Sequence, residues 1–375
     1  VIPGEEIEST DEEEALVAIQ QASTRVGYPL LLKASSGGGG KGMRAVEHPE
    51  ELLDAARSAR REALAAFGDG RVYLERLLTG SKHVEIQVLA DRHGRTIHLG
   101  ERECSVQRRH QKVFEEAPCA TMTEEIRSAM GKAAVAAAMA VNYEGAGTVE
   151  FLLAPNGEFF FLEMNTRIQV EHPVTELVTG VDIVREQLRI AAGHAMSCGE
   201  LHIRGHAIEV RLYAEDASNN FLPAIGPLAV FIPPEGPGIR LDTGVRQGDD
   251  VTPNYDPMLA KLIVWAPSRE EALQRMRRSL DEFVVLGTTT NLRFLRELCD
   301  VPDVIDGTTD TTMIDRLWPQ GWSPSVPLHI EDAALMAAAV GESAGLHRRN
   351  TPSSNGSDGP SGPVSPFATL NRRYP

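Results

Sequence analysis

The sequence feature that most constrains the fold is the stretch EFLLAPNGEFFFLEMNTRIQVE, which runs from Glu150 to Glu171. Two apolar runs flank Asn156-Gly157, a dipeptide typical of a tight β-hairpin turn. If the runs pair antiparallel, Glu150 and Glu163 lie on neighbouring strands near one edge of a hydrophobic sheet. Burying an unpaired carboxylate is costly, and a divalent cation shared between two carboxylates removes that cost. The stretch therefore predicts a hairpin that carries a metal site.

Polar residues continue beyond the second apolar run at every other position. Asn165, Arg167, Gln169 and Glu171 alternate with other residues, and period-2 geometry would point all of them to one side of a strand. Amide, guanidinium and carboxylate groups on one face suit a site that holds Mg²⁺, an anion and a proton acceptor together. The alternative is the solvated face of an edge strand, which each residue alone would also fit. The whole series beside apolar runs favours the functional interpretation.

Composition limits the classes of protein to which the chain can belong. Its 375 residues are 42% hydrophobic and 24% charged, which is ordinary for a globular protein of two or three domains. A net charge of −16 argues against a nucleic-acid partner. Neither a bilayer-spanning apolar run nor a signal peptide is recognisable, so we expect no membrane partner and a cytoplasmic location. The four cysteines are scattered without a CxxC pair, which favours neither a zinc cage nor a disulfide framework.

A glycine-rich segment follows a predicted buried strand at Tyr28–Ala34. It reads Ser-Ser-Gly-Gly-Gly-Gly-Lys-Gly from Ser35 to Gly42. Consecutive glycines cost backbone entropy, but they let the main chain approach a ligand and turn several N–H groups toward phosphate oxygens. The segment lacks the GKS or GKT of a P-loop, and a flexible linker is the alternative. The strands expected on both sides, the second at Met43–Val46, favour phosphate contact.

Capping and periodicity predict most other elements. We expect helices from an N-cap at Thr10 to about Thr24, over Pro49–Phe67, from an N-cap at Thr121 to about Val141, and over Arg269–Glu282. We expect a half-exposed strand at His83–Leu89 and further strands at His206–Tyr213 and Met258–Trp265. The charged segment Glu101–Lys112 is typical of a solvated loop, with a slight preference for a function of His110 and Lys112.

Five segments in order closely resemble biotin carboxylase, the ATP-grasp component of biotin-dependent carboxylases. They are KASSGGGGKGMR from Lys33, HVEIQVLAD from His83, ERECSVQRRHQKVFEEAP from Glu101, GAGTVEF from Gly145 and EMNTRIQVEHPVTE from Glu163. GHAIEVRLYAED from Gly205 and YDPMLAKLI from Tyr255 resemble the C-terminal domain of that family. The resemblance implies an α+β protein with an ATP-grasp domain over 1–200, whose lid is roughly 5–77, and a β-rich biotin carboxylase C-terminal domain over 201–320. Low-complexity sequence predicts a linker or disordered tail over 341–375.

The resemblance also implies an activity. The enzyme would use ATP and bicarbonate to form carboxyphosphate and then transfer CO₂ to a biotin nitrogen, as the first half-reaction of an acyl-CoA carboxylase. The implied cofactors are ATP, Mg²⁺ or Mn²⁺, and biotin. The implied partners are a biotin carboxyl carrier protein or domain, a carboxyltransferase subunit and further copies of the chain in a homo-oligomer. The sequence has no Met-Lys-Met biotinylation motif, so the carrier is expected on another chain or domain.

Site residues follow from the same resemblance, position by position. ATP would be bound by Lys33, Gly39, Gly40, Glu75, Leu77, His83, His110, Glu150 and Glu163. The metal would be bound by Glu150, Glu163 and Asn165. Bicarbonate and biotin would be surrounded by Lys112, Arg167, Gln169, Val170 and Arg211. The catalytic residues would be Lys112, Arg167, Glu171 and Arg211, with Glu171 as the base for bicarbonate and Arg211 stabilising the biotin enolate.

The resemblance has one large gap. The family has an N-terminal Rossmann-like subdomain, with an ATP-contacting Lys, ahead of the position that corresponds to Val1. We therefore expect the isolated chain to bind ATP weakly and to turn over little. Two alternatives stay open: an inactive truncated fragment that acts as a subunit, and another ATP-grasp ligase such as a carbamoyl-phosphate or amino-acid ligase. The runs QRRHQK and RIQVEHPVTE argue against the second alternative.

Overall fold

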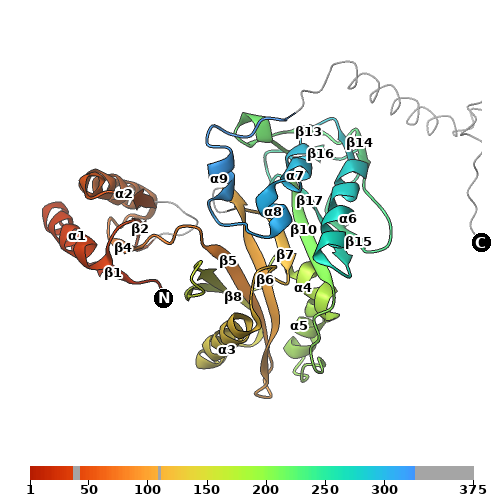
Figure 1. Ribbon diagram of the computed structural model, residues 1–375, viewed down its shortest axis with the longest axis horizontal. Coiled ribbons are helices and arrows are strands. Elements are labelled where there is room, and N and C mark those ends of the chain that lie inside the picture. Colours follow the sequence, from red (N-terminus) through yellow and green to blue (C-terminus); the bar gives the residue numbers. More distant parts are fainter. Residues whose placement is uncertain (37–42, 109–110, 326–375) are drawn as a thin grey trace, which may run out of the picture. The chain divides into compact units, whose positions relative to one another are not determined.

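The computed structural model of the chain describes residues 1–36, 43–108 and 111–325. Gly39, Gly40 and His110 lie outside the described residues, and so does the predicted tail at 341–375. Within the described part, Figure 1 shows helices packed around antiparallel sheets. This arrangement confirms the predicted mixture of α-helix and β-sheet.

The N-terminal part is a four-stranded sheet in the order β1-β4-β2-β3. Its strands are β1 (Gly4–Ile7), β2 (Leu30–Ala34), β3 (Arg44–Val46) and β4 (Val72–Arg76). The helices α1 (Glu12–Val26) and α2 (Leu52–Phe67) pack against the sheet, and the 3₁₀ turn η1 (Pro49–Glu51) precedes α2. Both helices were predicted, but the N-cap of α1 is Asp11 and not Thr10. The Asp11 carboxylate accepts a hydrogen bond from the Glu14 N–H at 3.0 Å.

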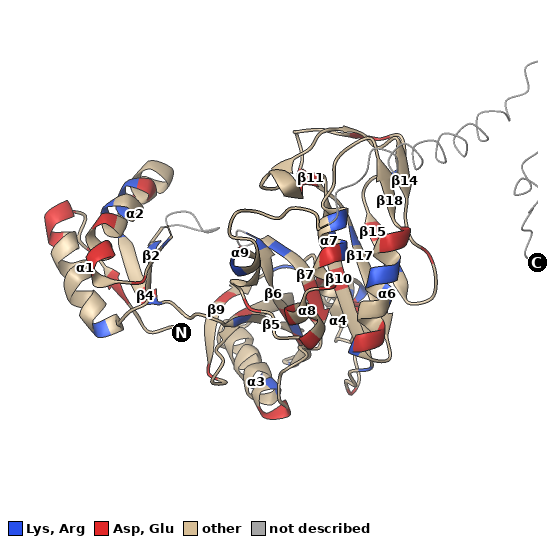
Figure 2. Ribbon diagram, turned by 45° about the horizontal axis from the view of Figure 1, so that its top comes forward, with Lys and Arg blue, Asp and Glu red and all other residues tan. Residues whose placement is uncertain are grey.

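The rest of the described chain is built on an eight-stranded antiparallel sheet in the order β15-β17-β10-β7-β6-β5-β8-β9. The strands are β5 (Lys82–Ala90), β6 (Thr96–Arg108), β7 (Gln111–Ala117), β8 (Gly145–Leu153), β9 (Phe159–Asn165), β10 (His206–Tyr213), β15 (Ile239–Thr243) and β17 (Met258–Ala266). Strand β10 pairs with β7, so the sheet continues across residue 200 without a break. Figure 2 shows acidic and basic positions on its central strands.

The segment Glu101–Lys112 differs from its prediction. It is not a solvated loop, because most of it belongs to the long strand β6 and Lys112 lies on β7. Strand β5 differs too, since it is buried on both faces and not half-exposed. Charged side chains tolerate this burial only when they are paired. Two ion pairs join β5 to β6, one between Arg102 and Glu85 and the other between Lys82 and Glu103.

Helices cover the large sheet. The helix α3 (Glu124–Ala140) packs against β5 and β6, and its N-cap is Thr123 and not the predicted Thr121. The helices α4 (His172–Thr179) and α5 (Ile183–Ala191) follow the hairpin β8–β9. The helix α6 (Arg269–Glu282) packs against β17 and β10, and the shorter α7 (Leu292–Leu298), α8 (Pro302–Asp306) and α9 (Met313–Leu317) complete the described chain.

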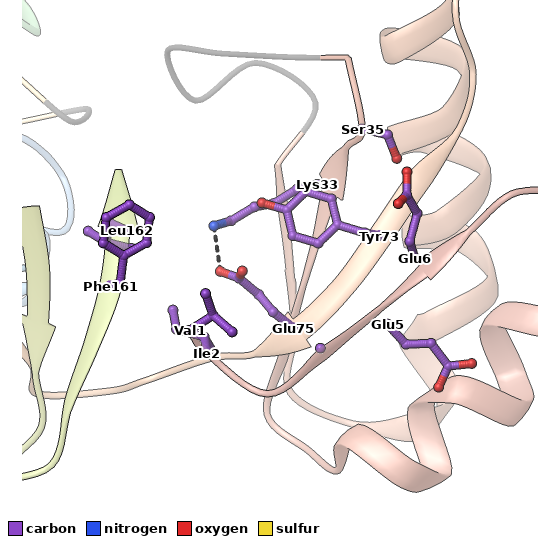
Figure 3. A pocket seen from close by; sticks show the side chains of 11 residues that line it. Val1, Ile2, Glu5, Glu6, Lys33, Ser35, Tyr73, Glu75, Phe161 and Leu162 are labelled. Carbon is purple, nitrogen blue, oxygen red and sulfur yellow. Dashed lines mark ion pairs between the residues drawn. The ribbon is translucent and has the colours of Figure 1, made fainter. Parts of the chain in front are cut away.

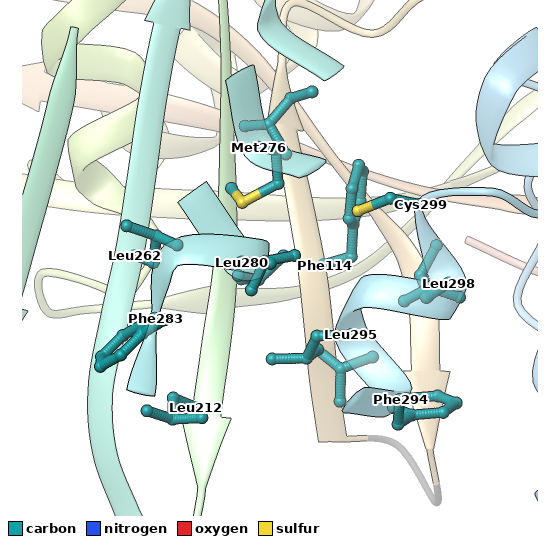
Figure 4. Close-up of a cluster of buried hydrophobic side chains, with 14 of the residues drawn as sticks. Phe114, Leu212, Leu262, Met276, Leu280, Phe283, Phe294, Leu295, Leu298 and Cys299 are labelled. Carbon is teal, nitrogen blue, oxygen red and sulfur yellow. The ribbon is translucent and has the colours of Figure 1, made fainter. Parts of the chain in front are cut away.

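The C-terminal part also contains small two-stranded antiparallel sheets. They pair β11 (Glu215–Asp216) with β12 (Leu222–Pro223), β13 (Gly226–Pro227) with β16 (Asp250–Val251), and β14 (Val230–Ile232) with β18 (Val284–Leu286). The turn η2 (Ala217–Asn219) lies between β11 and β12. The largest hydrophobic core joins this part to the sheet, and Figure 4 shows Phe114 of β7 among Met276, Leu280 and Leu295.

Residues beyond α8 are tied to the large sheet by a buried polar cluster. The ammonium of Lys82 donates to the carbonyl oxygens of Gly307 and Thr309, at 2.8 and 2.9 Å, and to Glu103 at 3.0 Å. None of the helices in the described part of the chain has the length and apolar character needed to cross a bilayer.

Candidate active site

The hairpin predicted from the Asn-Gly turn is formed by β8 and β9. Glu150 and Glu163 are directly opposite each other in its register, which confirms that two carboxylates lie on neighbouring strands. Residues opposite each other in an antiparallel pair point to the same face. The Asn165 side-chain amide joins them, since its Nδ2 donates to Glu150 Oε1 at 3.0 Å.

The predicted alternation beyond Asn165 is wrong. The strand β9 ends at Asn165, and the chain then turns to begin α4 with Pro173 in its first turn. The Arg167 side chain is exposed and donates to the carbonyl oxygen of Ile168 at 3.2 Å, so this structure does not direct it to the same side as Gln169 and Glu171. The turn instead brings Gln169 back to the hairpin, where its Nε2 donates to Glu150 Oε1 at 2.8 Å.

Lys112 is the point at which the carboxylates converge. Its ammonium lies 2.5 Å from Glu85, 2.7 Å from Glu171 and 3.1 Å from Glu150. Burial alone would lower the pKa of Lys112, but these carboxylates raise it well above its ordinary value. The ammonium therefore stays charged and holds together residues from β5, β8 and the turn before α4.

Arg102 is a functional candidate that the sequence reasoning missed. Its side chain is fully buried and lies 2.5 Å from Glu85. It also donates to the side-chain oxygens of Gln87 at 2.8 Å and of Gln169 at 2.8 Å, and to the hydroxyls of Thr148 and Thr175. Burial by itself would raise the pKa of the Glu85 carboxyl, but Arg102 and Lys112 lower it to about 2. The acidic position Glu85, in the alternation HVEIQVL, was the available signal for this pair.

Arg211 extends the network across the sheet to β10. Its Nε donates to Glu115 at 2.6 Å and its Nη2 donates to Glu171 at 2.9 Å. Glu171 is thus clamped between Arg211 and Lys112, with 2% of its surface exposed. The carbonyl oxygen of Val170 accepts a hydrogen bond from Lys261 of β17. The structure therefore brings together predicted residues from three segments that are far apart in the sequence, namely Lys112, the stretch Glu150–Glu171 and Arg211.

His83 lies on the other side of Glu150. The two side chains are 3.0 Å apart, and the second ring nitrogen of His83 lies 2.7 Å from the amide of Gln107. Gln107 was not predicted, although it lies in the same motif as Lys112. The contacts of His83 place it next to the predicted metal carboxylate.

The predicted nucleotide residues Lys33 and Glu75 form an ion pair with each other on β2 and β4. They line a pocket of about 440 Å³ together with Tyr73, Phe161 and Leu162, and Figure 3 shows the Lys33 ammonium and the Glu75 carboxylate beside Val1 and Ile2. Leu77 is not among the residues that line this pocket, and its N–H donates to the carbonyl oxygen of Pro29 at 2.9 Å.

The predicted metal ligands fit the chemistry of magnesium. Hard divalent cations take oxygen ligands, and Glu150, Glu163 and Asn165 offer oxygens on one face of the hairpin. Within the described residues, two groups also have candidate ligand atoms within 4.8 Å of one another: His83, Glu85 and Glu150, and Glu85, Cys104 and Glu171. Glu163 belongs to neither group, and its side chain is exposed.

Two family profiles match the sequence in succession. The profile described as "Carbamoyl-phosphate synthase L chain, ATP binding domain" matches residues 1–198. The profile described as "Biotin carboxylase C-terminal domain" matches residues 209–316. Both matches agree with the order of motifs in the sequence.

Curated relatives are similar over most of the chain. The mitochondrial methylcrotonoyl-CoA carboxylase subunit alpha of Dictyostelium discoideum is 48% identical over 332 residues, which cover 88% of this chain and 48% of that protein. The biotin carboxylase of Nostoc sp. is 46% identical over 318 residues, which cover 84% of this chain and 70% of that protein. The chain thus spans about half the length of the first relative and more than two thirds of the second.

A solved structure supports the same comparison. It is the biotin carboxylase domain dimer of the Hydrogenobacter thermophilus 2-oxoglutarate carboxylase, in complex with MgADP, ADP and bicarbonate. The two folds agree with a TM-score of 0.78 and 43% sequence identity over 85% of this chain and 70% of that chain. Together with the two profiles, this similarity confirms the predicted fold class, an ATP-grasp fold followed by a β-rich C-terminal domain.

Proposed function

The chain belongs to the biotin carboxylase family, and we propose that it contributes the site at which ATP and bicarbonate are used to carboxylate biotin. The observation that carries the proposal is the position of Glu171, a buried carboxylate clamped between Lys112 at 2.7 Å and Arg211 at 2.9 Å. A fixed carboxylate beside two cations suits the binding of an anion and the removal of its proton.

In the proposed reaction each of these groups has one task. Glu171 accepts the proton of bicarbonate, which is a poor nucleophile until it is deprotonated. Lys112 offsets the negative charge of the bicarbonate and of the carboxyphosphate formed from it. Arg211 stabilises the enolate oxygen of deprotonated biotin, because its guanidinium is held in place by Glu115 and Glu171. Gln169, the Val170 carbonyl and, after rotation toward the site, Arg167 would complete the surroundings of bicarbonate and biotin.

We assign nucleotide binding to the side of the site that faces the N-terminal sheet. Lys33, Gly39, Gly40, Glu75 and Leu77 would contact ATP from the lid, while His83, Glu150 and Glu163 would contact it from the large sheet. His110 would also contact ATP. A magnesium or manganese ion held by Glu150, Glu163 and Asn165 would neutralise charge on the phosphates during phosphoryl transfer. The residues 1–200 and 201–320 would then act as the ATP-grasp and C-terminal domains.

The partners follow from the chemistry of biotin. Biotin would reach the site on a carrier protein or domain, and a carboxyltransferase would pass the carboxyl group to an acceptor. The methylcrotonoyl-CoA carboxylase relative favours an acyl-CoA as that acceptor. The dimer in the Hydrogenobacter structure supports a homo-oligomer.

The activity is tested by ATP hydrolysis in the native full-length protein. We expect hydrolysis that depends on bicarbonate and is stimulated by free biotin. A folded protein that hydrolyses ATP independently of both compounds would contradict the proposal. Ligation of another substrate without biotin would favour a different ATP-grasp ligase.

The metal assignment makes a separate prediction. Replacing Glu150 with Gln removes a charged oxygen ligand, so the Mg²⁺ concentration that gives half-maximal activity should rise at least about tenfold. The measurement is a Mg²⁺ titration of the bicarbonate-dependent ATP hydrolysis. The matched control is Glu235→Gln, at an exposed carboxylate in a loop of the C-terminal part, which should leave the titration unchanged. An unchanged Mg²⁺ requirement in Glu150→Gln would remove Glu150 from the metal site.

A further inference from the structure

Two buried glutamates stand side by side behind Arg211. Glu115 on β7 and Glu209 on β10 are directly opposite each other in the antiparallel register. Both side chains are completely buried. Opposite residues of an antiparallel pair have side chains on the same face, with Cβ atoms about 5 Å apart. Two acidic groups therefore share one small, water-excluded space in the sheet.

Only one of the four carboxylate oxygens of this pair has a hydrogen-bond partner among the described residues. Glu115 Oε1 accepts the Arg211 Nε–H at 2.6 Å. Glu115 Oε2 and both carboxylate oxygens of Glu209 have no hydrogen-bond partner among the described residues. An ionised carboxylate without partners is among the most costly groups to bury, whereas a protonated one costs much less. The geometry therefore favours a proton on Glu209.

The surrounding charges lead to the same conclusion. The groups that face the pair are Arg211 and Tyr213 on β10, Lys261 on β17, Lys112 on β7, Cys104 on β6 and Glu171 before α4. Lys112 forms ion pairs with three other carboxylates. Lys261 donates a hydrogen bond to the Val170 carbonyl oxygen and forms an ion pair with Asp242. Arg211 is shared by Glu115 and Glu171. No cation in this set is left to pair with Glu209.

The acidities of the two groups agree with this arrangement. Burial raises the pKa of Glu209 well above its ordinary value, and the neighbouring Glu115 raises it further. Burial also raises the pKa of Glu115, to about 7, against the opposing effect of Arg211. The two groups titrate as a coupled pair. Arg211 donates a hydrogen bond to Glu115 and none to Glu209, so this geometry favours Glu115 as the ionised member and Glu209 as the member that keeps its proton.

We propose that Glu115 and Glu209 are a positioning pair for Arg211, in which ionised Glu115 holds the guanidinium and protonated Glu209 fills the polar space beside it. Protonation of Glu115 then weakens its hold on Arg211 and with it the binding of the anionic reactants. This inference rests on the proposed function, since Arg211 is the residue proposed to stabilise the biotin enolate. The pair is completely buried behind Arg211, so it acts on the reactants through Arg211.

The protonation of Glu209 is tested by measuring thermal stability as a function of pH. This measurement does not depend on enzymatic activity. The pKa of Glu209 is higher in the folded protein than in the unfolded chain. The stabilisation that comes from its proton is therefore fully present below the unfolded-state pKa and is lost as the pH rises through the folded-state pKa. Gln mimics the protonated acid and cannot ionise, so the melting temperature of Glu209→Gln relative to wild type should rise as pH increases above 4.5. We expect a relative gain of roughly 3 to 6 °C between about pH 5 and about pH 8. Glu235→Gln should show no such trend.

An infrared measurement covers the case in which Glu209→Gln does not fold. Wild-type protein near neutral pH should show the C=O stretch of a buried protonated carboxylic acid that persists to higher pH than any exposed carboxyl group. A melting-temperature difference that is independent of pH, or the lack of this infrared band, would overturn the assignment of the proton.

The positioning role is tested by the pH profile of Glu115→Gln in the native full-length protein. Gln keeps a hydrogen bond to Arg211 but not the charge, so kcat/KM for bicarbonate should fall about tenfold at about pH 8. The ratio of wild type to variant should approach one below about pH 6, where wild-type Glu115 is protonated too. A ratio that does not change with pH would refute the positioning role. A wild-type protein without bicarbonate-dependent hydrolysis at any pH would instead refute the proposed function.

Discussion

Replacing Arg102 with Met is expected to lower the free energy of unfolding by about 3 to 5 kcal/mol, which is the usual cost of breaking a buried ion pair from one side. The Arg102 side chain is fully buried and donates to five different side chains. Met fills a similar volume but leaves Glu85 with Lys112 as its remaining cation. The uncompensated acceptors of Gln87 and Gln169 add to the loss.

Denaturant-induced unfolding measures this effect. The matched control is Arg185→Met, at an exposed position of α5, which should change the free energy of unfolding by less than about 0.5 kcal/mol. A loss below about 1 kcal/mol for Arg102→Met would show that the network does not depend on this guanidinium.

Replacing Glu171 with Gln is expected to reduce kcat for biotin carboxylation by about 10²- to 10⁴-fold, the usual contribution of a positioned general base. Gln has nearly the same size and can still accept a hydrogen bond from Lys112 or Arg211, so the fold of the site should persist. It cannot take a proton from bicarbonate. The affinity for ATP should change little, because the contacts of Glu171 are with Lys112 and Arg211 and not with Lys33 or Glu75.

The kinetic comparison requires that the variant be folded. The melting temperature of Glu171→Gln should therefore be measured beside kcat, with Glu235→Gln as the surface control. A folded variant that keeps more than about one tenth of the wild-type kcat would exclude Glu171 as the base.

Local sequence patterns predicted the elements whose signals lie close together in the chain. The Asn156-Gly157 turn and its apolar flanks predicted the hairpin, and the register places Glu150 opposite Glu163 as expected. Helices with a capping residue near their start were predicted to within a few positions. The caps themselves were wrong by one or two residues because several Thr, Ser and Asp side chains near each helix start can compete for the same N–H groups.

Patterns failed where a partner distant in sequence decides the structure. The charges of Glu101–Lys112 were typical of a solvated loop, yet Arg102 is buried against Glu85 and Glu103 against Lys82. The Thr309 segment that completes the Lys82 cluster lies 227 residues further along the chain. A local window contains no information about such pairs, so burial of charge on a central strand was not predictable from it.

In the candidate site, too, some positions were predictable from the sequence and others depend on partners that are distant in sequence. The resemblance named Lys112, Gln169, Glu171 and Arg211, and the structure places them around one another through hydrogen bonds. Period-2 geometry did not predict the position of Arg167, because the strand ends at Asn165 and the helix α4 begins at His172, with Pro173 in its first turn. The alternation in HAIEVRLY puts Glu209 on the same face as Arg211, but it does not indicate that Glu115 lies opposite Glu209. Their importance comes from the pairing of β7 with β10, which joins residues about ninety positions apart.

The most direct test of the proposed function is the transfer of label from isotopically labelled bicarbonate to free biotin by the native full-length protein in the presence of ATP and Mg²⁺. We predict the formation of acid-labile carboxybiotin that requires ATP, and its loss in Glu171→Gln but not in Glu235→Gln. Failure of folded wild-type protein to label biotin, or equal labelling by Glu171→Gln, would contradict the assignment of this site to biotin carboxylation.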